Sequence, residues 1–218
     1  MTDQILPIVL RYEETGVTEA TEKSLSNAGF TVWEYADREG VGSMARAFNR
    51  VMMELDQYEV DEKYIWFVTN VTFPPELPAS LFEVLESNSE AAAVHPGMTS
   101  SHAFINNAKN VGPIHFIEWT AAMVRYKAWM DVGVLDEAMP YVHFDLDWSH
   151  RAKLNGWQLL VDGRVRVDHT YLHVKQPEKI SRFRSDLRAY RHEASAQAMI
   201  DKWGNDWKTT LCKGGNCG

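Results

Sequence analysis

The pattern that decides the fold lies in Ile5–Tyr35, which reads ILPIVLRYEETGVTEATEKSLSNAGFTVWEY. Ile5–Leu10 is a short and nearly all-apolar run, which predicts a strand covered on both faces. Thr18–Asn27 follows as a helix, with a threonine at the N-cap and Gly29 just past the end. Phe30–Tyr35 predicts a second strand. Together these segments predict the first β–α–β unit of a parallel sheet.

The same alternation continues as far as His95. Ser43 predicts the N-cap of a helix whose apolar residues recur at helical spacing. Tyr64–Thr69, Leu77–Leu85 and Ala91–His95 then predict a strand, a helix and a strand. This repetition predicts an α/β fold with a Rossmann-like, mostly parallel central sheet and helices on both faces. In such sheets ligands bind beyond the carboxyl ends of the strands. Those ends are Arg11–Thr15, Tyr35–Gly42 and Thr69–Phe73.

The second half of the chain is less regular. Thr99–Gly112 is polar and predicts a loop. Asp162-Gly163, between the apolar runs Trp157–Val161 and Val165–His169, predicts a β-hairpin. A long basic helix is predicted from Pro177 onward.

Composition is that of an ordinary globular chain of one-domain size. The 218 residues are 45% hydrophobic and 24% charged, which excludes disorder as the main state. The net charge of −8 argues against polyanion binding by the whole surface, although not against a local basic patch. No apolar stretch approaches the roughly 18 residues of a membrane helix, and the start of the chain lacks the basic region of a signal peptide. Cys212 and Cys217 lie at the end of the sequence, so no disulfide framework is expected and the cytoplasm is the expected location.

The sharpest candidate for chemistry is Phe144–Trp148, FDLDW, directly before a helix pattern. A carboxylate such as Asp145 or Asp147, held at a helix N-terminus in a partly dry cleft, can act as a general base. The same side chains can instead cap the helix, and spacing alone leaves both interpretations open. A two-carboxylate glycosidase is weakly indicated, because side chains at alternate residues rarely flank a glycosidic bond at about 5–10 Å.

Two further patterns carry weaker signals. Asp168-His169 ends a predicted strand, where imidazole either binds a divalent ion or a phosphate, or is a hydrogen-bonded surface group. Gly40-Val41-Gly42 precedes a helix start, where glycines allow close approach to a phosphate. An ordinary strand-to-helix turn has the same glycine pattern.

Taken in order, these pieces resemble family 2 glycosyltransferases of the GT-A fold. The resemblance covers most of Ile5–Gly204 and is strongest over Trp119–His169. Family members carry a GA-x4-R-x6-GG-x-DE run, an ED-x-D run, an R-x4-G-W/Y run and a strand that ends in histidine. The similar stretches here are TAAMVRYKAWMDVGVLDEAM, HFDLDWSHRAKLNGW and VDGRVRVDH, and Lys202-Trp203-Gly204 is similar to a frequent C-terminal motif.

The resemblance implies a GT-A-like glycosyltransferase domain over residues 1–174. Its nucleotide-sugar half is expected at about 1–98 and its acceptor half at about 99–174. A basic C-terminal helix over 175–209 is expected to pack on this domain, and residues 210–218 to form a flexible tail. The implied activity is the inverting transfer of a hexosyl or pentosyl group from a nucleotide-diphosphate sugar to an acceptor hydroxyl.

The resemblance also implies individual site residues. Asp145 matches the catalytic base and Asp147 its companion carboxylate. His169, together with Asp147, is implied near a metal ion and the diphosphate. The residues implied in donor binding are Arg11, Tyr12, Glu13, Asp37, Arg46 and Asn70. The residues implied in acceptor binding are Glu118, Trp119 and Trp148.

The sequence departs from the family at its metal motif, D-x-D. Thr69-Asn70-Val71-Thr72 stands there without a carboxylate, and a neutral amide oxygen is a poor ligand for Mg²⁺ or Mn²⁺. A divalent cofactor is therefore expected only if the diphosphate, Asp145 or Asp147 and His169 hold it. Otherwise cationic side chains such as Arg46 must neutralise the leaving group. Phe144 replaces the family's glutamate before the base, which is expected to raise the pKa of Asp145.

The expected partners are a nucleotide-sugar donor and an acceptor that is either a saccharide or DNA, with the oligomeric state open. Lys175–Arg191 has a local balance of 6 − 2 = +4, typical of a solvated helix face or of a phosphate-binding one. Compact members of such families include phage enzymes that add sugars to hydroxymethylated pyrimidines in DNA, which would place the protein in the host cytoplasm. The alternative function is a degenerate, non-catalytic nucleotide- or glycan-binding module, which the missing metal carboxylates favour.

Overall fold

The computed structural model describes residues 2–11, 15–32, 34–37, 43–55, 63–69, 71–99, 105, 107–140, 142–169 and 193–211. The strands are β1 (Ile5–Arg11), β2 (Glu34–Asp37), β3 (Tyr64–Val68), β4 (Ala91–Met98), β5 (Val111–Pro113), β6 (Met123–Arg125) and β7 (Gln158–Val167). The helices are η1 (Thr2–Gln4), α1 (Thr15–Asn27), α2 (Met44–Leu55), α3 (Leu77–Ser87), α5 (Tyr126–Val132), α6 (Phe144–Leu154) and α9 (Trp207–Leu211), and residues 193–203 are also helical.

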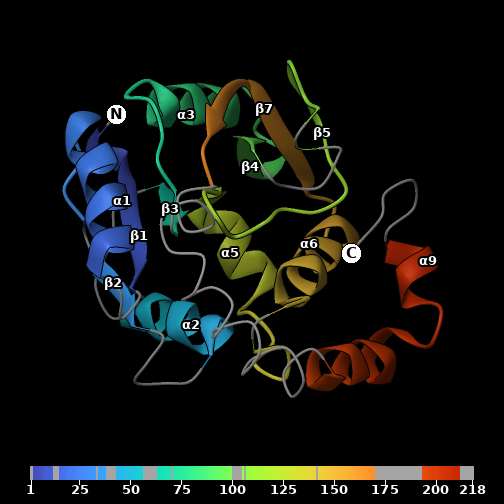
Figure 1. Cartoon of the computed structure of the whole chain (residues 1–218). Helices are drawn as coiled ribbons and strands as arrows, with labels where there is room; N and C mark the ends of the chain where they lie inside the picture. The colour runs from blue at the N-terminus through green and yellow to red at the C-terminus, as the bar shows by residue number, and fades with distance from the viewer. Residues whose placement is uncertain are drawn as a thin grey trace.

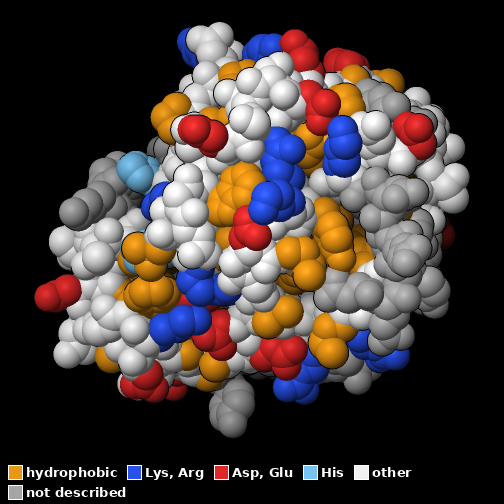
Figure 2. All heavy atoms as spheres, turned by 180° about the vertical axis from the view of Figure 1, so that it is seen from behind, with side chains coloured by type: hydrophobic (Ala, Val, Ile, Leu, Met, Phe, Trp, Pro, Cys, Tyr) orange, Lys and Arg blue, Asp and Glu red, His pale blue; other side chains and the backbone are white. Residues whose placement is uncertain are grey.

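The seven strands form one sheet in the order β2-β1-β3-β6-β4-β7-β5 (Figure 1). Among these strands, β6 and β5 run opposite to the other five, so the sheet is mostly parallel as predicted. None of the described helices is both long and apolar enough to cross a membrane. Seen from behind, the described surface carries acidic and basic side chains in close alternation (Figure 2).

Helices cover both faces of the sheet because its inner strands are apolar on both sides. Strand β1 sends Leu6, Ile8 and Leu10 into a core shared with α2, α5 and α6. Its alternate residues Ile5 and Val9 enter a second core shared with α1 and α3. The continuous apolar run in the sequence therefore marks a strand buried between two layers of helices.

The ends of the first three strands meet at one edge of the sheet. Strand β1 pairs in parallel with β2 so that Arg11 lies opposite Asp37, and with β3 so that Val9 lies opposite Val68. This is the edge at which the sequence predicted a ligand site.

Two predicted helix boundaries are confirmed in their chemistry. The Ser43 hydroxyl accepts a hydrogen bond from the backbone N–H of Arg46 at 3.1 Å, which makes Ser43 the N-cap of α2. Gly29 follows α1 with a positive φ of 81°, a conformation that glycine adopts without steric cost. Helix α1 itself begins at Thr15, three residues before the predicted start.

The predicted hairpin at Asp162-Gly163 is wrong. Strand β7 runs through this dipeptide without reversing, and it pairs with β4 on one side and β5 on the other. The extra residues form a bulge, since Pro96 lies opposite Asp162 but Gly97 lies opposite Arg166. The Asp162 carboxylate accepts hydrogen bonds from the Arg164 N–H at 3.1 Å and the Ser80 hydroxyl at 2.6 Å, which fixes this bulge.

Gly163 is required in the bulge by close packing. A Cβ there would lie 2.4 Å from the carbonyl carbon of Ala108, and its N–H donates to the Asn110 carbonyl at 3.1 Å. Gly163, which indicated a turn in the sequence, instead allows the backbone of β7 to pack closely against Ala108.

Candidate active site

The site is built where the segment after β3 meets the end of β7. Thr72 and Asp168 exchange backbone hydrogen bonds of 3.0 and 2.8 Å. The Thr99 hydroxyl donates to the Asp168 carboxylate at 3.1 Å and accepts from the His169 N–H at 3.3 Å. Asp168 and His169 are therefore fixed beside Thr72, in the segment where the sequence resemblance placed a metal motif.

A second segment connects the end of β3 to α6. The Thr69 N–H donates to the Thr120 carbonyl at 2.8 Å, and the Ile117 N–H donates to the Ser149 hydroxyl of α6 at 2.9 Å. Glu118 lies between these two attachments. It is thus held close to the carboxyl edge of the sheet and close to α6.

Asp145 lies in the first turn of α6 and is partly buried. Burial, the larger cause, and the negative charge of Glu118, the smaller one, raise the pKa of Asp145 to about 7. Backbone N–H groups oppose the rise, among them the N–H of Leu146, which donates to Oδ1 of Asp145 at 2.8 Å. A carboxyl group with this pKa takes up and releases a proton near neutral pH, as a general base must. The negative charge of Glu118 therefore acts on Asp145, although the two residues were predicted for different roles.

His95 is a neighbour of this pair that the sequence did not indicate. Its ring is fully buried in β4, with Nδ1 against the Pro96 carbonyl and Nε2 without a hydrogen-bond partner. Burial lowers the pKa of His95, and the negative charge of Glu118 opposes this effect. A histidine within an apolar strand carries no sequence signal that separates it from an ordinary core residue.

Asp147 does not lie with Asp145. Two residues along a helix correspond to a rotation of about 200°, so the two side chains leave α6 on opposite sides. Asp147 is completely buried, and its oxygens contact Arg151 Nε, Lys202 Nζ and Trp203 Nε1, each at 2.9 Å. Its predicted role as a companion carboxylate and metal ligand is not supported by this placement, because its oxygens already bind protein donors.

The two predicted tryptophans are core residues. Trp148 is completely buried and donates from Nε1 to the Gly133 carbonyl at 3.0 Å. Trp119 is 2% exposed and packs edge-to-face against Trp148 with ring centroids 5.3 Å apart. The predicted acceptor contact of Trp148 is therefore wrong, because its side chain is buried in the core. Trp119 fixes in the core the segment that carries Glu118.

The predicted donor residues are placed only in part. The backbones of Arg11 and Asp37 are neighbours at the carboxyl edge, whereas Tyr12, Glu13 and Asn70 lie outside the described residues. Arg46, in the first turn of α2, is exposed and pairs with Glu137 at 2.8 Å.

The donor set does not fit a metal ion held by the protein. Among the described residues, no group of three or more histidine, cysteine, aspartate or glutamate side chains converges. The described candidates beside Thr72 are Asp168 and His169, whereas Mg²⁺ takes six oxygen ligands in octahedral geometry. No step of the chemistry is therefore assigned to a metal.

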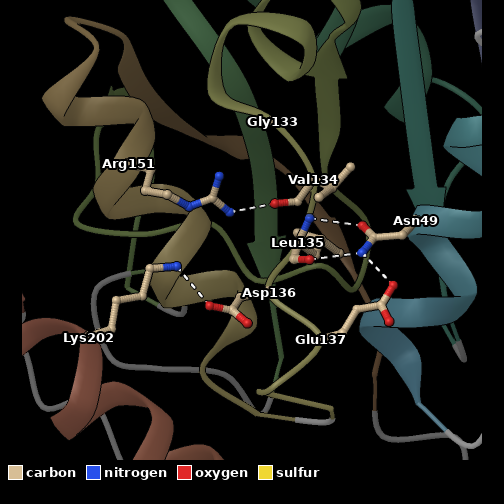
Figure 3. Close-up of a pocket in the computed structure, with 8 residues that line it drawn as sticks. All are labelled: Asn49, Gly133, Val134, Leu135, Asp136, Glu137, Arg151 and Lys202. Carbon is tan, nitrogen blue, oxygen red and sulfur yellow. Dashed lines mark hydrogen bonds and ion pairs between the residues drawn. The ribbon is translucent and has the colours of Figure 1, made fainter.

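A cavity of about 510 Å³ lies between α2, the loop after α5, α6 and residues 193–203 (Figure 3). Its lining includes Asn49, Arg151 and Lys202, whose hydrogen bonds are shown as dashed lines. It lies on the Asp147 side of α6, and Asp145 does not line it. It is separate from the site at the sheet edge.

Solved structures establish the fold. No protein-family model and no curated protein matches the chain. A crystal structure of S. aureus TarS matches with a TM-score of 0.59 and 12% identity, over 96% of this chain and 44% of that one. The 1–349 form of S. aureus TarS matches with a TM-score of 0.56 and 14% identity, over 95% and 72%. GalNAc-T7, crystallised with UDP, GalNAc and Mn²⁺, matches with a TM-score of 0.52 and 8% identity, over 96% and 52%.

These neighbours are glycosyltransferases of the GT-A fold, and the chain shares that fold. The chain spans about half the length of the GalNAc-T7 chain and less than half of the longer TarS chain. At such low identities the likeness extends to the fold and not to the reaction.

Proposed function

We propose that the protein is an inverting glycosyltransferase of family 2 that moves a sugar from a nucleotide-diphosphate sugar to an acceptor hydroxyl. One observation carries this proposal: burial, and to a smaller extent the negative charge of Glu118, raises the pKa of Asp145 in the first turn of α6 to about 7. The UDP bound to GalNAc-T7 supports the class of donor.

In the proposed reaction Asp145 removes the proton of the acceptor hydroxyl as the oxygen attacks the anomeric carbon. The new carbon–oxygen bond forms while the bond from that carbon to the phosphate oxygen breaks. The nucleoside diphosphate leaves with the electron pair, and the proton stays on Asp145. Attack opposite the leaving group inverts the anomeric configuration.

The residues at the edge of the sheet take the remaining roles in this proposal. Arg11 and Asp37, at neighbouring strand ends, hold the nucleotide. His169, fixed beside Thr72 through Asp168 and Thr99, lies near the diphosphate. Glu118 keeps the pKa of Asp145 high and orients the acceptor.

The test is to incubate the protein with UDP-, GDP-, CMP- and dTDP-linked sugars and a panel of acceptors, with and without Mn²⁺, and to measure released nucleotide. Release above the buffer blank, with a product whose anomeric configuration by NMR is opposite to that of the donor, is the expected result. A product that retains the configuration would exclude Asp145 as the base of a single displacement. A requirement for Mn²⁺ would show that a metal ion takes part in the transfer.

A non-catalytic nucleotide- or glycan-binding module is the second candidate. The absence of carboxylates in Thr69–Thr72 favours it. A ligand that binds the folded state raises the melting temperature by mass action. Thermal stabilisation by a nucleotide sugar, without any nucleotide release over all acceptors, would identify this second function.

We propose a saccharide or a hydroxymethylated pyrimidine in phage DNA as the acceptor, and the host cytoplasm as the location in the second case. We assign a DNA contact to the basic segment Lys175–Arg191, whose six basic and two acidic residues give a local charge of 6 − 2 = +4. DNA binding through phosphates weakens steeply with salt. Binding that does not change with salt between about 50 and 200 mM would exclude DNA and leave a saccharide as the acceptor.

A further inference from the structure

The side of α6 opposite Asp145 carries a compact network of charges. We call it the Asp147 network, and it consists of Asp136, Asp147, Arg151, Lys202 and Trp203. Asp147 Oδ2 accepts from Arg151 Nε, and Oδ1 accepts from Trp203 Nε1 and contacts Lys202 Nζ, all at 2.9 Å. Asp147 is completely buried, and the Arg151 side chain is 19% exposed. Buried ion pairs with good geometry hold their partners in fixed orientation.

Arg151 extends the network into the loop after α5. Its Nη1 donates to the Val132 carbonyl at 2.6 Å. Its Nη2 donates to the Val134 carbonyl at 2.7 Å, a bond that Figure 3 draws as a dashed line. The Trp148 indole donates to the carbonyl of Gly133, between these two. The first two turns of α6 are thereby bound to three consecutive carbonyl groups of one loop.

Lys202 and Trp203 join a distant part of the chain to the same carboxylate. Lys202 Nζ also reaches Asp136 at 2.8 Å, so it bridges two acidic side chains. The Trp203 ring packs edge-to-face on His150 with centroids 4.6 Å apart. The two acidic and two basic side chains balance, and each charged group has a partner of the opposite sign.

This network restrains the rotation of α6 about its axis, because it attaches one side of the helix to the loop after α5 and to residues 193–203. Side-chain ends lie about 5–6 Å from a helix axis, so a rotation of about 20° displaces them by about 2 Å. Asp145 leaves the helix on the opposite side from Asp147, so any rotation that follows loss of the network moves Asp145 relative to Glu118. A displacement of about 1 Å of a reacting group can cost about 100-fold in rate.

We propose that Trp203 and Lys202 are positioning residues for the site: by binding Asp147 they fix the rotation of α6 and therefore the place of Asp145 beside Glu118. The catalytic part of this inference rests on the proposed function, whereas the structural part does not.

The test compares Trp203→Phe, Lys202→Gln and Lys202→Arg with the control Asp201→Asn. Asp201 is exposed on the same helix and bonds Gln197 rather than Asp147. Trp203→Phe keeps the ring but removes the N–H donor. We expect Trp203→Phe and Lys202→Gln to lower kcat roughly 10- to 100-fold with the donor KM unchanged. Lys202→Arg is expected to recover most of the activity, and Asp201→Asn to match the wild type.

A second measurement needs no donor and separates this inference from the proposed function. Amide hydrogen exchange in Trp203→Phe is expected to accelerate in the first turn of α6 and to stay unchanged in α3. This result supports the positioning role even if the wild type releases no nucleotide from any donor. Unchanged exchange in the first turn of α6 overturns the inference. A wild-type kcat in both Trp203→Phe and Lys202→Gln also overturns the inference. A fall in kcat that is explained by a uniform fall in stability overturns it as well.

Discussion

Helix α6 presents two aspartates of one chemical type in opposite environments. Asp145 is partly buried, faces the like charge of Glu118, and has a pKa raised to about 7. Asp147 is completely buried among two cations and an indole N–H. The difference shows that a carboxylate surrounded by opposite charge stabilises structure, whereas one beside a like charge is prepared for proton transfer. The predictions below test this contrast.

Replacement of Asp145 by Asn tests the reactive side of α6. We expect kcat to fall roughly 100- to 10,000-fold, the usual contribution of a general base, with nucleotide binding retained. The measurement is nucleotide release together with donor binding by thermal shift. Asp131→Asn, an exposed position on α5, is the matched control. Unchanged turnover in Asp145→Asn would exclude Asp145 as the base.

Replacement of Asp147 by Ala tests the structural side. Removing one partner of a buried ion pair is expected to lower the free energy of unfolding by about 3–5 kcal/mol, because Arg151 and Lys202 lose their shared partner. Urea denaturation measures this change. Asp131→Ala breaks the exposed pair with Lys127 and is expected to cost about 0.2–1 kcal/mol. Equal effects of the two substitutions would contradict the contrast between the buried and exposed pairs.

Replacement of Glu118 by Gln sharpens the electrostatic part of the contrast. Loss of its negative charge lowers the pKa of Asp145, so the acidic limb of the pH–rate profile is expected to move to lower pH. The shift is expected to be smaller than the whole rise in pKa, since burial is the larger cause. A profile with an unmoved acidic limb would show that Glu118 does not act on the base.

The pH dependence of stability tests the raised pKa of Asp145 without any substrate. The pKa of Asp145 is 3.8 as an ordinary aspartate and about 7 in the folded chain, so the folded state binds this proton more tightly. Its contribution to stability is therefore present below about pH 4 and is lost as the pH rises toward 7. Asp145→Asn is expected to flatten this part of the curve of unfolding free energy against pH, whereas Asp131→Asn should retain it. Superimposable curves for Asp145→Asn and the wild type would contradict the raised pKa.

Much of the fold follows from local pattern, and the exceptions have physical causes. Strands β1, β3 and β4 were predicted because each is a continuous apolar run between two layers of helices. Strand β2 lies at Glu34–Asp37 rather than at the predicted Phe30–Tyr35. Strands β5 and β6 have three residues each, too few to show a period. The Asp162-Gly163 signal failed because tertiary contacts of Asp162 and Gly163 replaced a turn by a bulge.

The candidate site around Asp145, Glu118 and His169 stays a prediction from the sequence, whereas the structure separates Asp145 from Asp147. The prediction that Asp145 and Asp147 act together assumed that the helix begins after both residues. Helix α6 begins at Phe144, so both residues lie within it and their side chains leave it on opposite sides. Lys202 and Trp203 contact Asp147 across more than fifty residues of chain, and no local pattern records such a contact.

The long sequence separation within the Asp147 network has a consequence for synthesis on the ribosome. Asp147 emerges 56 residues before Trp203, a delay of roughly 3 to 11 s at 5–20 residues per second. Until then the nascent chain holds a carboxylate whose later partners do not yet exist. The contacts of Lys202 and Trp203 with Asp147 therefore form only after β7, the last of the described strands, has been synthesised.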